Sequence, residues 1–352
     1  MIHVGIVGLG FMGMIHYLAY QQLPGVRVTA ICTRSEQRRR GDWTGIRGNF
    51  GPAGRQMDLA GMAAYARLDE MLASEELDVI DVTLPPAQHA VATIAALRAG
   101  KHVLCEKPMA LQLEECDRMA AAAREGNRRL YVGHVLPFFA EYAWALAVAR
   151  SGQYGALKGA AFRRVISNPL WLTNYWTVDS GGPLFDLHSH DAHLIRLLFG
   201  MPERVTSRGR LRNGVPEFWH SHFEFANQDI LVEATAGTIE HQGRTFDHGF
   251  EIHLEQATLL FQFAVIGGEG QSLCPPTVLD ASGRAMPMDL GSGDPMDAFE
   301  AEIRHVLSCL VEDCESDILN SQLARDAIQI CEMQRTSLLA SRGQRVSAGR
   351  SD

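Results

Sequence analysis

The sequence predicts an α/β protein with two domains, a doubly wound parallel sheet followed by an α+β domain with a large, open, mostly antiparallel sheet. Three observations support this prediction. A glycine-rich turn joins an apolar strand to a helical pattern, short apolar strands alternate with helical patterns up to residue 132, and longer alternating strands follow. At 352 residues the chain is also longer than a domain with a single hydrophobic core usually is. We expect domains at 1–132 and 133–352, with the C-terminal helices free to pack back toward the first.

The first domain is expected to be a parallel sheet with helices on both faces, because parallel strands need helical crossovers. Apolar patterns place strands at 2–7, 26–32, 78–83, 102–105 and 129–132, and helices at 14–23, 68–75, 88–99 and 113–125. An insert at residues 41–61, with Trp43, Pro52 and several glycines, interrupts this alternation. Long loops of this kind are usually functional or mobile, and the sequence leaves the choice open.

The second domain is expected to begin with a helix at 141–151 and to continue mainly as strands. The strands are placed at 157–166, 204–211, 217–225, 229–237, 249–256 and 258–263. Alternation of polar and apolar residues, as in 220–225, is typical of a sheet with one face toward solvent. Helical spacing returns at 296–312 and at 322–340, and the last helix is expected to end at Gly343.

The turn GLGFMG, which contains Phe11 and Met12, predicts a nucleotide cradle at the start of the first domain. A strand that breaks on glycines and reopens as a helix brings backbone N–H groups and a positive helix end to one point. Gly8 allows the tight turn, Gly10 lets the backbone approach a pyrophosphate, and Gly13 lets the helix pack closely on the sheet. Strand, turn and helix together predict a Rossmann fold that binds a dinucleotide.

The residues after the second strand, Thr33, Arg34 and Ser35, favour NADP over NAD. NAD sites usually place an acid there for the ribose 2′-OH, whereas NADP sites place hydroxyls and arginine there for the 2′-phosphate. This segment contains no acid, and further arginines follow at 38–40. The alternative is that Arg34 is a solvated loop cation and that NAD binds without a carboxylate partner.

Composition restricts the class of ligand and the compartment. A net charge of −9 argues against nucleic acids and anionic membranes as partners, so a small molecule is expected. The seven cysteines are scattered without CxxC spacing, which favours a reducing cytoplasm. The N-terminus lacks the features of a signal peptide, and polar residues interrupt the apolar stretch at 130–149, so no membrane span is expected.

Two further sequence motifs contain residues that are suited to catalysis. Glu106-Lys107-Pro108 follows a parallel strand, at the sheet edge where ligands collect, and an ammonium there can stabilise charge on a substrate oxygen. The segment GGPLFDLHSHDAH contains Asp186, His190 and His193, which share one face if the helix includes Asp186. A histidine is the usual group for moving a hydroxyl proton near neutral pH.

In this order the strings resemble the glucose-fructose oxidoreductase/inositol dehydrogenase family (Gfo/Idh/MocA). The resemblance covers nearly the whole chain. It rests on GLGFMG, on TLPPAQH from Thr83 to His89, on EKP, on the GG…DxxxH pattern and on the helical tail ARDAIQICEMQRTS. It implies an NAD(P)-dependent oxidoreductase acting on a hydroxyl or carbonyl carbon of a sugar, polyol or derivative, and a homo-oligomer, dimer or tetramer.

The resemblance also implies roles for individual residues. Lys107 corresponds to the catalytic lysine, Asp186 to the acid that orients the substrate, and His190 to the general base. The segment that borders nicotinamide and ribose corresponds to Thr83, Leu84, Pro85 and His89, and the acid that flanks the site corresponds to Glu106.

The chain departs from the family pattern near the expected substrate pocket. These differences therefore concern the identity of the substrate rather than the fold or the cofactor. His193 stands where many members have an aspartate, His188 stands where a small residue is common, and Pro137 replaces the usual arginine before Phe138. In the loop before the GG pair, Trp171, Tyr175 and Trp176 could be packing residues or, for Trp176 above all, a platform for a sugar ring.

Three alternatives stay open at this point. Asp186, His188, His190 and His193 are superficially similar to the DxHxH ligand sets of metallohydrolases, although on a helix His188 points away from the others. We expect no metal, because the glycine turn and EKP would then have no partner chemistry. A nucleotide-sensing regulator would keep the fold without turnover, and some relatives recycle the bound cofactor to hydrolyse glycosides.

Overall fold

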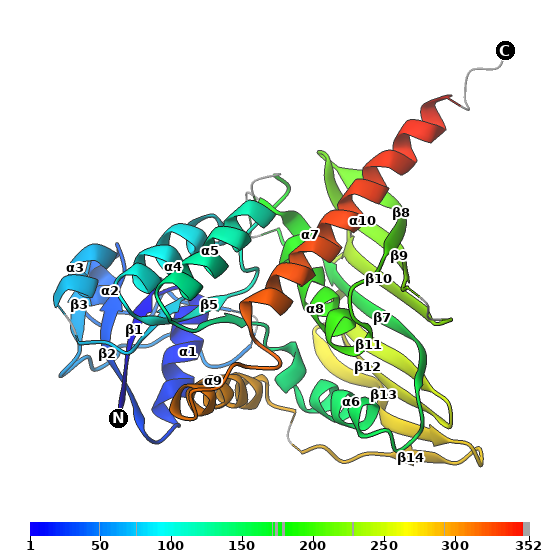
Figure 1. Cartoon of the computed structure of the whole chain (residues 1–352), viewed down its shortest axis with the longest axis horizontal. Coiled ribbons are helices and arrows are strands. Elements are labelled where there is room, and N and C mark those ends of the chain that lie inside the picture. The colour runs from blue at the N-terminus through cyan, green and yellow to red at the C-terminus, as the bar shows by residue number, and fades with distance from the viewer. Residues whose placement is uncertain are drawn as a thin grey trace. The chain divides into compact units, whose positions relative to one another are not determined.

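The computed structural model describes residues 1–48, 50–74, 76–170, 172, 175–177, 180–226, 229–291 and 293–347, with the backbone alone for 342–347. Contacts divide the chain into two compact units. The first consists of Met1–Phe139 and Gly293–Arg325, and the second of the described parts of 140–292 and 326–352. Each unit is built on its own sheet (Figure 1).

The sheet of the first unit has six parallel strands in the order β3-β2-β1-β4-β5-β6. They are β1 (Ile2–Val7), β2 (Val26–Cys32), β3 (Ala63–Tyr65), β4 (Val79–Val82), β5 (His102–Glu106) and β6 (Leu130–Gly133). This is the Rossmann order, in which successive strands are added on one side of β1 and then, from β4 on, on the other side. The predicted fold is confirmed. The short β3 was missed, because Ala-Ala-Tyr directly after the insert shows no alternation.

Helices cover both faces of this sheet (Figure 1). On one face α1 (Phe11–Gln21) packs against α9 (Pro295–Val311), and Phe299 and Ile303 of α9 are buried in the same core as β1. On the other face lie α3 (Leu68–Ser74), α4 (His89–Arg98) and α5 (Leu113–Glu125). The remaining short elements are α2 (Glu36–Arg39), η1 (Pro86–Gln88) and η2 (Leu136–Phe138). The predicted end of α3, Glu75, lies outside the described residues.

The insert at 41–61 is part of this core rather than a free loop. Trp43 is fully buried, its indole N–H donates to the Arg38 carbonyl oxygen at 3.0 Å, and its ring meets the edge of Tyr17 at a centroid distance of 5.0 Å. Phe50 stacks on Phe299, with centroids 5.4 Å apart, and contacts the ring of Phe11 at 4.9 Å. The insert therefore fastens the N-terminus of α1 to α9.

The second unit contains an eight-stranded sheet in the order β14-β13-β12-β11-β7-β10-β9-β8. Of its described strand pairs, β7 with β10 is parallel and the others are antiparallel. The strands are β7 (Leu157–Ser167), β8 (Arg204–Arg212), β9 (Val215–Glu224), β10 (Leu231–Ile239), β11 (Arg244–Leu254), β12 (Ala257–Ile266), β13 (Glu269–Asp280) and β14 (Ala285–Pro287). The predicted open, mostly antiparallel sheet is confirmed.

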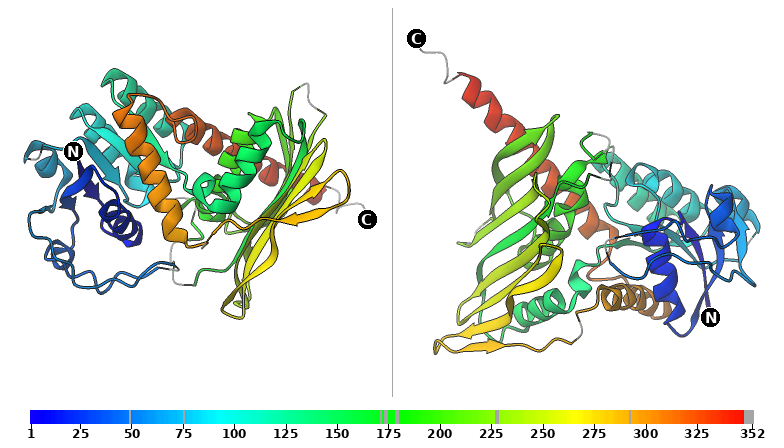
Figure 2. Two further views of the ribbon diagram at one scale, coloured as in Figure 1. Left: turned by 90° about the horizontal axis from the view of Figure 1, so that it is seen from below. Right: turned by 180° about the vertical axis from the view of Figure 1, so that it is seen from behind.

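The helices of the second unit gather on one face of its sheet, and none of the described helices covers the opposite face (Figure 2). They are α6 (Ala140–Ser151), α7 (Gly182–Asp186), α8 (His188–Phe199) and the C-terminal part of α10 (Ser321–Ser347). The predicted end of the last helix at Gly343 is wrong, since α10 continues to Ser347. An interior glycine costs a helix only about 1 kcal/mol and does not have to end it.

No helix within the described part of the chain combines the length and the apolar character that a membrane span requires.

If the insert belongs to the core, replacing Trp43 by Ala should lower the free energy of unfolding by about 3–5 kcal/mol, because a large cavity is left behind. Urea denaturation followed by circular dichroism measures this change. The control is Val91→Ala, at a position of α4 that is 69% exposed, which should change stability by no more than about 0.5 kcal/mol. Equal stability of both variants would contradict the packing of the insert.

Candidate functional site

The glycine turn between β1 and α1 has the close approaches that a nucleotide cradle needs. Gly8 has φ +100, and a Cβ there would lie 2.7 Å from the Thr83 carbonyl oxygen. A Cβ on Gly13 would lie 2.3 Å from the Gly8 oxygen, so only glycine lets α1 approach the strand this closely. A Cβ on Gly10 would meet no atom within 4 Å. Gly10 thus faces open space, and an anion can approach the backbone amides there.

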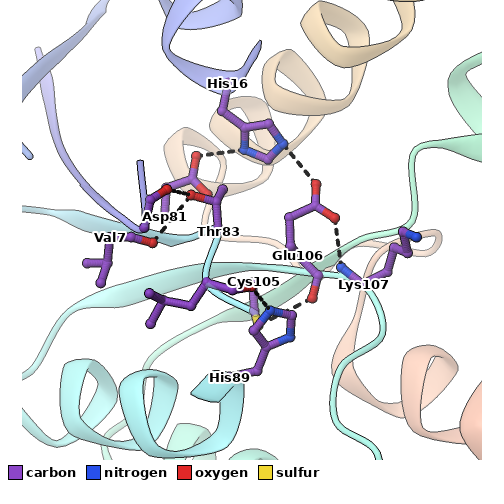
Figure 3. A network of polar contacts seen from close by, with 10 residues as sticks. Val7, His16, Asp81, Thr83, His89, Cys105, Glu106 and Lys107 are labelled. Atoms are coloured by element: carbon purple, nitrogen blue, oxygen red, sulfur yellow. Dashed lines mark hydrogen bonds and ion pairs between the residues drawn. The ribbon is translucent and has the colours of Figure 1, made fainter. Parts of the chain in front are cut away.

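The segment after β4 is fastened directly to this turn. The Thr83 hydroxyl donates to the Gly8 carbonyl oxygen at 2.5 Å, and the Thr83 amide donates to the Val7 oxygen at 2.8 Å (Figure 3). The carboxyl ends of β1 and β4 therefore form one rigid edge. Leu84 and Pro85 continue from Thr83 along this edge.

His89 connects the segment after β4 to the segment after β5. Its ring nitrogens lie 2.7 Å from the Leu84 carbonyl oxygen and 2.9 Å from the Pro108 carbonyl oxygen. Burial lowers the pKa of His89, and a neutral ring donates to one of these two carbonyl oxygens at a time. Because His89 is fully buried, it supports the segments from behind.

Lys107 stands at the end of β5, next to this edge. It is half-buried, and in Figure 3 its side chain extends away from the Glu106 carboxylate. Glu106 accepts the backbone N–H of Lys107 at 3.0 Å through Oε2. The structure thus brings together the glycine turn, Thr83, Leu84, Glu106 and Lys107, all within the first unit.

Sequence reasoning missed the group on the other side of Glu106. His16 of α1 lies between Asp81 of β4 and Glu106, at 2.8 Å and 3.0 Å (Figure 3). All three are buried. The sequence did indicate these residues. Asp81 interrupts the apolar strand VIDV, and His16 interrupts the apolar face of α1. An isolated polar residue that is buried needs a polar partner.

At the end of β2, arginine side chains hold the loop and the glycine turn together. Arg38 donates to the Leu9 carbonyl oxygen at 2.7 Å, and Arg39 donates to the Thr33 carbonyl oxygen at 2.6 Å. The Ser35 hydroxyl caps α2 by accepting from the Arg38 amide at 3.3 Å, while Arg34 is exposed. Positive charge is therefore concentrated beside the place where the adenosine ribose of a dinucleotide lies.

In the second unit the helix that carries His190 does not include Asp186, so the condition for a shared face with His190 and His193 is not met. The chain forms two helices that meet at Leu187, and Gly181 and Gly182, both with positive φ, turn the chain tightly into the first of them, α7. A Cβ on Gly182 would lie 2.2 Å from Val215. Asp186 is half-buried and accepts the Tyr175 hydroxyl at 3.2 Å.

The three histidines of this segment differ in exposure. His190 is half-buried, whereas His188 and His193 are fully buried, so His193 does not share an accessible face with Asp186 and His190. The ring of His188 packs against Trp219 and Phe223, at centroid distances of 5.8 and 6.5 Å. Across the described residues, no group of three or more His, Cys, Asp or Glu side chains is arranged to hold a metal ion.

A buried ion pair fixes α8 to the sheet beneath it. Arg164 of β7 binds Asp191 through two N–H groups, at 2.7 and 3.1 Å. Burial acts to raise the pKa of Asp191, but the guanidinium outweighs it and lowers the pKa to about 2. Asp191 therefore stays ionised and holds the helix that carries His190.

Trp176 is half-buried and is held from two sides. Its indole N–H donates to Asn168 at 3.1 Å, and the Arg212 guanidinium lies 4.8 Å from the ring centroid. One ring face thus carries a cation rather than being open for a sugar. Trp171 lies outside the described residues.

Comparison with known proteins places these features in a family. Residues 2–134 match the oxidoreductase family with an NAD-binding Rossmann fold, and residues 142–260 match the GFO/IDH/MocA C-terminal domain. A dehydrogenase of Comamonas testosteroni, which acts on 1-carboxy-3-chloro-3,4-dihydroxycyclohexa-1,5-diene, is 33% identical over 144 residues, 40% of this chain and 36% of that protein. The chain covers 36%, 49% and 41% of the first three curated relatives.

Two longer matches extend the similarity over both units. Levoglucosan dehydrogenase of Pseudarthrobacter phenanthrenivorans is 25% identical over 310 residues, 74% of each chain. The WlbA dehydrogenase of Bordetella pertussis, solved with NADH and UDP-GlcNAcA, has the same fold, with a TM-score of 0.73, 19% identity and coverage of 96% of both chains. The chain belongs to the Gfo/Idh/MocA family of oxidoreductases, whose N-terminal part is an NAD-binding Rossmann fold.

Proposed function

We propose that this protein is an NAD(P)-dependent dehydrogenase or reductase that acts on a CH–OH carbon of a sugar, polyol or derivative. One observation carries the proposal: the glycine turn, Thr83 and Lys107 lie along one edge of a Rossmann sheet, at the point where its strand order reverses. The printed names of two relatives, levoglucosan dehydrogenase and the dihydroxy-cyclohexadiene dehydrogenase, support a hydroxylated ring as the substrate class.

The residues of the first unit suit a dinucleotide. The amides of the glycine turn, with Phe11 and Met12 at the start of α1, would hold the pyrophosphate, and Thr83, Leu84 and Pro85 would border the ribose and nicotinamide. When bound, the nicotinamide supplies hydride transfer, which no side chain can perform. What the protein provides is the placement of groups around it.

We propose that Lys107, Asp186 and His190 serve a single reaction. In the oxidative direction His190 takes the proton of the substrate hydroxyl, and in the reductive direction it returns one. The Lys107 ammonium stabilises negative charge on that oxygen, and Asp186 orients the hydroxyl and the imidazole. The order of the family motifs along the chain supports these roles.

We propose NADP as the preferred cofactor, with NAD as the alternative. The support is the cluster of arginines at the end of β2, where Arg34 is exposed and the guanidinium groups of Arg38 and Arg39 bind backbone oxygens of the adjoining turns. A 2′-phosphate would gain charge-assisted hydrogen bonds there.

We further propose that the uncovered face of the eight-stranded sheet mediates self-association, as a dimer or tetramer (Figure 2).

The activity is tested by mixing the purified protein with NADP⁺ or NAD⁺ and a panel of sugars and polyols, and by recording absorbance of the reduced nicotinamide. We expect net reduction of the bulk cofactor with at least one hydroxylated ring. Release of a sugar from a glycoside without net reduction would instead show a cofactor-recycling hydrolase. Tight cofactor binding with no turnover on any substrate would favour a sensor.

The cradle is tested by comparing alanine at two glycines. Gly10→Ala should leave the free energy of unfolding unchanged but weaken NADP⁺ binding about tenfold or more, because its Cβ projects toward open space where the pyrophosphate is expected. Gly45→Ala, a loop position that is also free of neighbours within 4 Å, is the matched control and should alter neither property. Calorimetric titration gives the affinities. Unchanged binding by Gly10→Ala would place the nucleotide elsewhere.

The catalytic roles are tested by a double-mutant cycle of Lys107→Met and His190→Ala. Each change should lower kcat by about 10²-fold or more while cofactor affinity stays within a few-fold. Because the two groups serve one step, the double variant should lose less than the product of the single losses. Turnover of Lys107→Met at the wild-type level would remove this lysine from the mechanism.

The cofactor preference is tested at Arg34. Arg34→Ala should weaken NADP⁺ binding by about tenfold and leave NAD⁺ binding within about twofold, since only NADP⁺ carries the 2′-phosphate. Arg40→Ala removes the same charge from an exposed side chain that pairs with Glu36, and serves as the control. Equal effects of Arg34→Ala on both cofactors would refute the assignment.

A further inference from the structure

A buried charged cluster lies directly behind the proposed catalytic lysine, and the mechanism above does not use it. It consists of His16 on α1, Asp81 on β4 and Glu106 on β5, with Glu302 on α9 close by. His16, Asp81 and Glu302 are fully buried, and Glu106 is 6% exposed. Charged groups are costly to bury, so such a cluster needs an explanation.

The partners of His16 determine its protonation state. Both ring nitrogens face carboxylate oxygens, Nδ1 toward Asp81 at 2.8 Å and Nε2 toward Glu106 at 3.0 Å. Ionised carboxylates only accept hydrogen bonds, and a neutral imidazole has a single N–H. With both carboxylates ionised, both contacts are satisfied only by an imidazolium. Burial opposes this charge, but the two carboxylates outweigh it and raise the pKa of His16 well above its ordinary value.

The other titratable groups that face the cluster, Glu302 and Tyr20, favour their neutral forms and so do not neutralise the charge of the His16 imidazolium. Glu302 comes from α9, and burial together with the charge of Glu106 raises its pKa well above the ordinary value, which favours its neutral acid form. Tyr20, one turn after His16 on α1, also has a raised pKa, through burial and then the charge of Asp81. The ring of Phe299 closes the site, 6.0 Å from the imidazole. Asp81 and Glu106 remain as the hydrogen-bond partners of His16.

Glu106 passes the effect of His16 to Lys107. Its Oε1 is held by His16, and its Oε2 accepts the backbone N–H of Lys107 at 3.0 Å. Both carboxylate oxygens are thus engaged, and the carboxylate is tied to α1 rather than free to turn toward the ammonium of its neighbour. Without His16, Glu106 would lose its buried partner and could rotate.

We propose that His16 is a positioning residue: as a permanent imidazolium between Asp81 and Glu106, it holds the Glu106 carboxylate on the Lys107 backbone and so keeps it from pairing with the Lys107 side chain. This inference rests on the proposed function, since it assigns the purpose of the cluster to the chemistry of Lys107. It adds His16 and Asp81, which sequence reasoning did not single out, to the residues on which turnover depends.

The protonation state is tested by nitrogen NMR of the histidine rings in the full-length protein, from about pH 6 to about pH 9. We expect both nitrogens of His16 to stay protonated throughout, and Glu106→Gln to make the ring titrate. His102 at the opposite end of β5 is the internal control, because burial and then Arg128 and Arg129 lower its pKa, so its ring should lose its proton at a lower pH than an ordinary histidine. Titration of wild-type His16 near its ordinary pKa would overturn the proposal.

The positioning role is tested by placing His16→Gln in two backgrounds. In the wild type it should lower kcat about tenfold with little change in cofactor affinity, and in Lys107→Met it should cause no further loss, because there is no ammonium left to protect. His102→Gln is the matched control and should leave kcat within about twofold. Thermal unfolding of each variant verifies that it is folded.

The outcomes separate this proposal from the proposed function. An equal loss from His16→Gln in both backgrounds would show a general structural role and overturn the positioning proposal alone. Full turnover of Lys107→Met by itself would refute the proposed role of the lysine, and the role of His16 would fail with it.

Discussion

The first unit depends on the close approach of α1 to the carboxyl ends of β1 and β4. At Gly13 the helix lies so near the Gly8 carbonyl oxygen that a Cβ would be only 2.3 Å away, and at Gly8 the turn lies against Thr83. This contact aligns the helix dipole and the free amides of the turn at one edge of the sheet. It also places His16, one turn further along α1, between the strands that carry Asp81 and Glu106. The cradle and the support of Lys107 thus depend on the same packing.

Much of this architecture could be predicted, because local patterns decided it. The glycine turn, the alternation of strands and helices and the EKP string all lie within short windows, and the Rossmann sheet and the second sheet were predicted from them. The strand β13 was missed because Pro275 and Pro276 argue against a strand, although prolines are tolerated near a sheet edge. The break between α7 and α8 at Leu187 was missed because no glycine or proline marks it in the sequence.

Residues that act through distant partners were the hardest to predict. Asp81 lies 65 positions after His16 in the sequence, and Glu106 lies 90 positions after it. Only the fold brings these three residues together. Trp43 was noticed in a glycine-rich insert, but its burial depends on Tyr17 and Arg38. His188 illustrates the reverse: it was singled out for its chemistry, yet it packs among aromatic rings. Side-chain type alone does not separate a ligand from a core residue.

The placement of α9 has a consequence for how the chain acquires its structure during synthesis. Phe299 and Ile303 complete a core whose other members come mainly from the N-terminal third of the chain, and Phe50 of the insert stacks directly on Phe299. Until the ribosome has released α9, the apolar surface of α1 has no cover and must be shielded in another way. The two units therefore cannot mature strictly one after the other, because the first is completed only after every strand of the second unit's sheet has been translated.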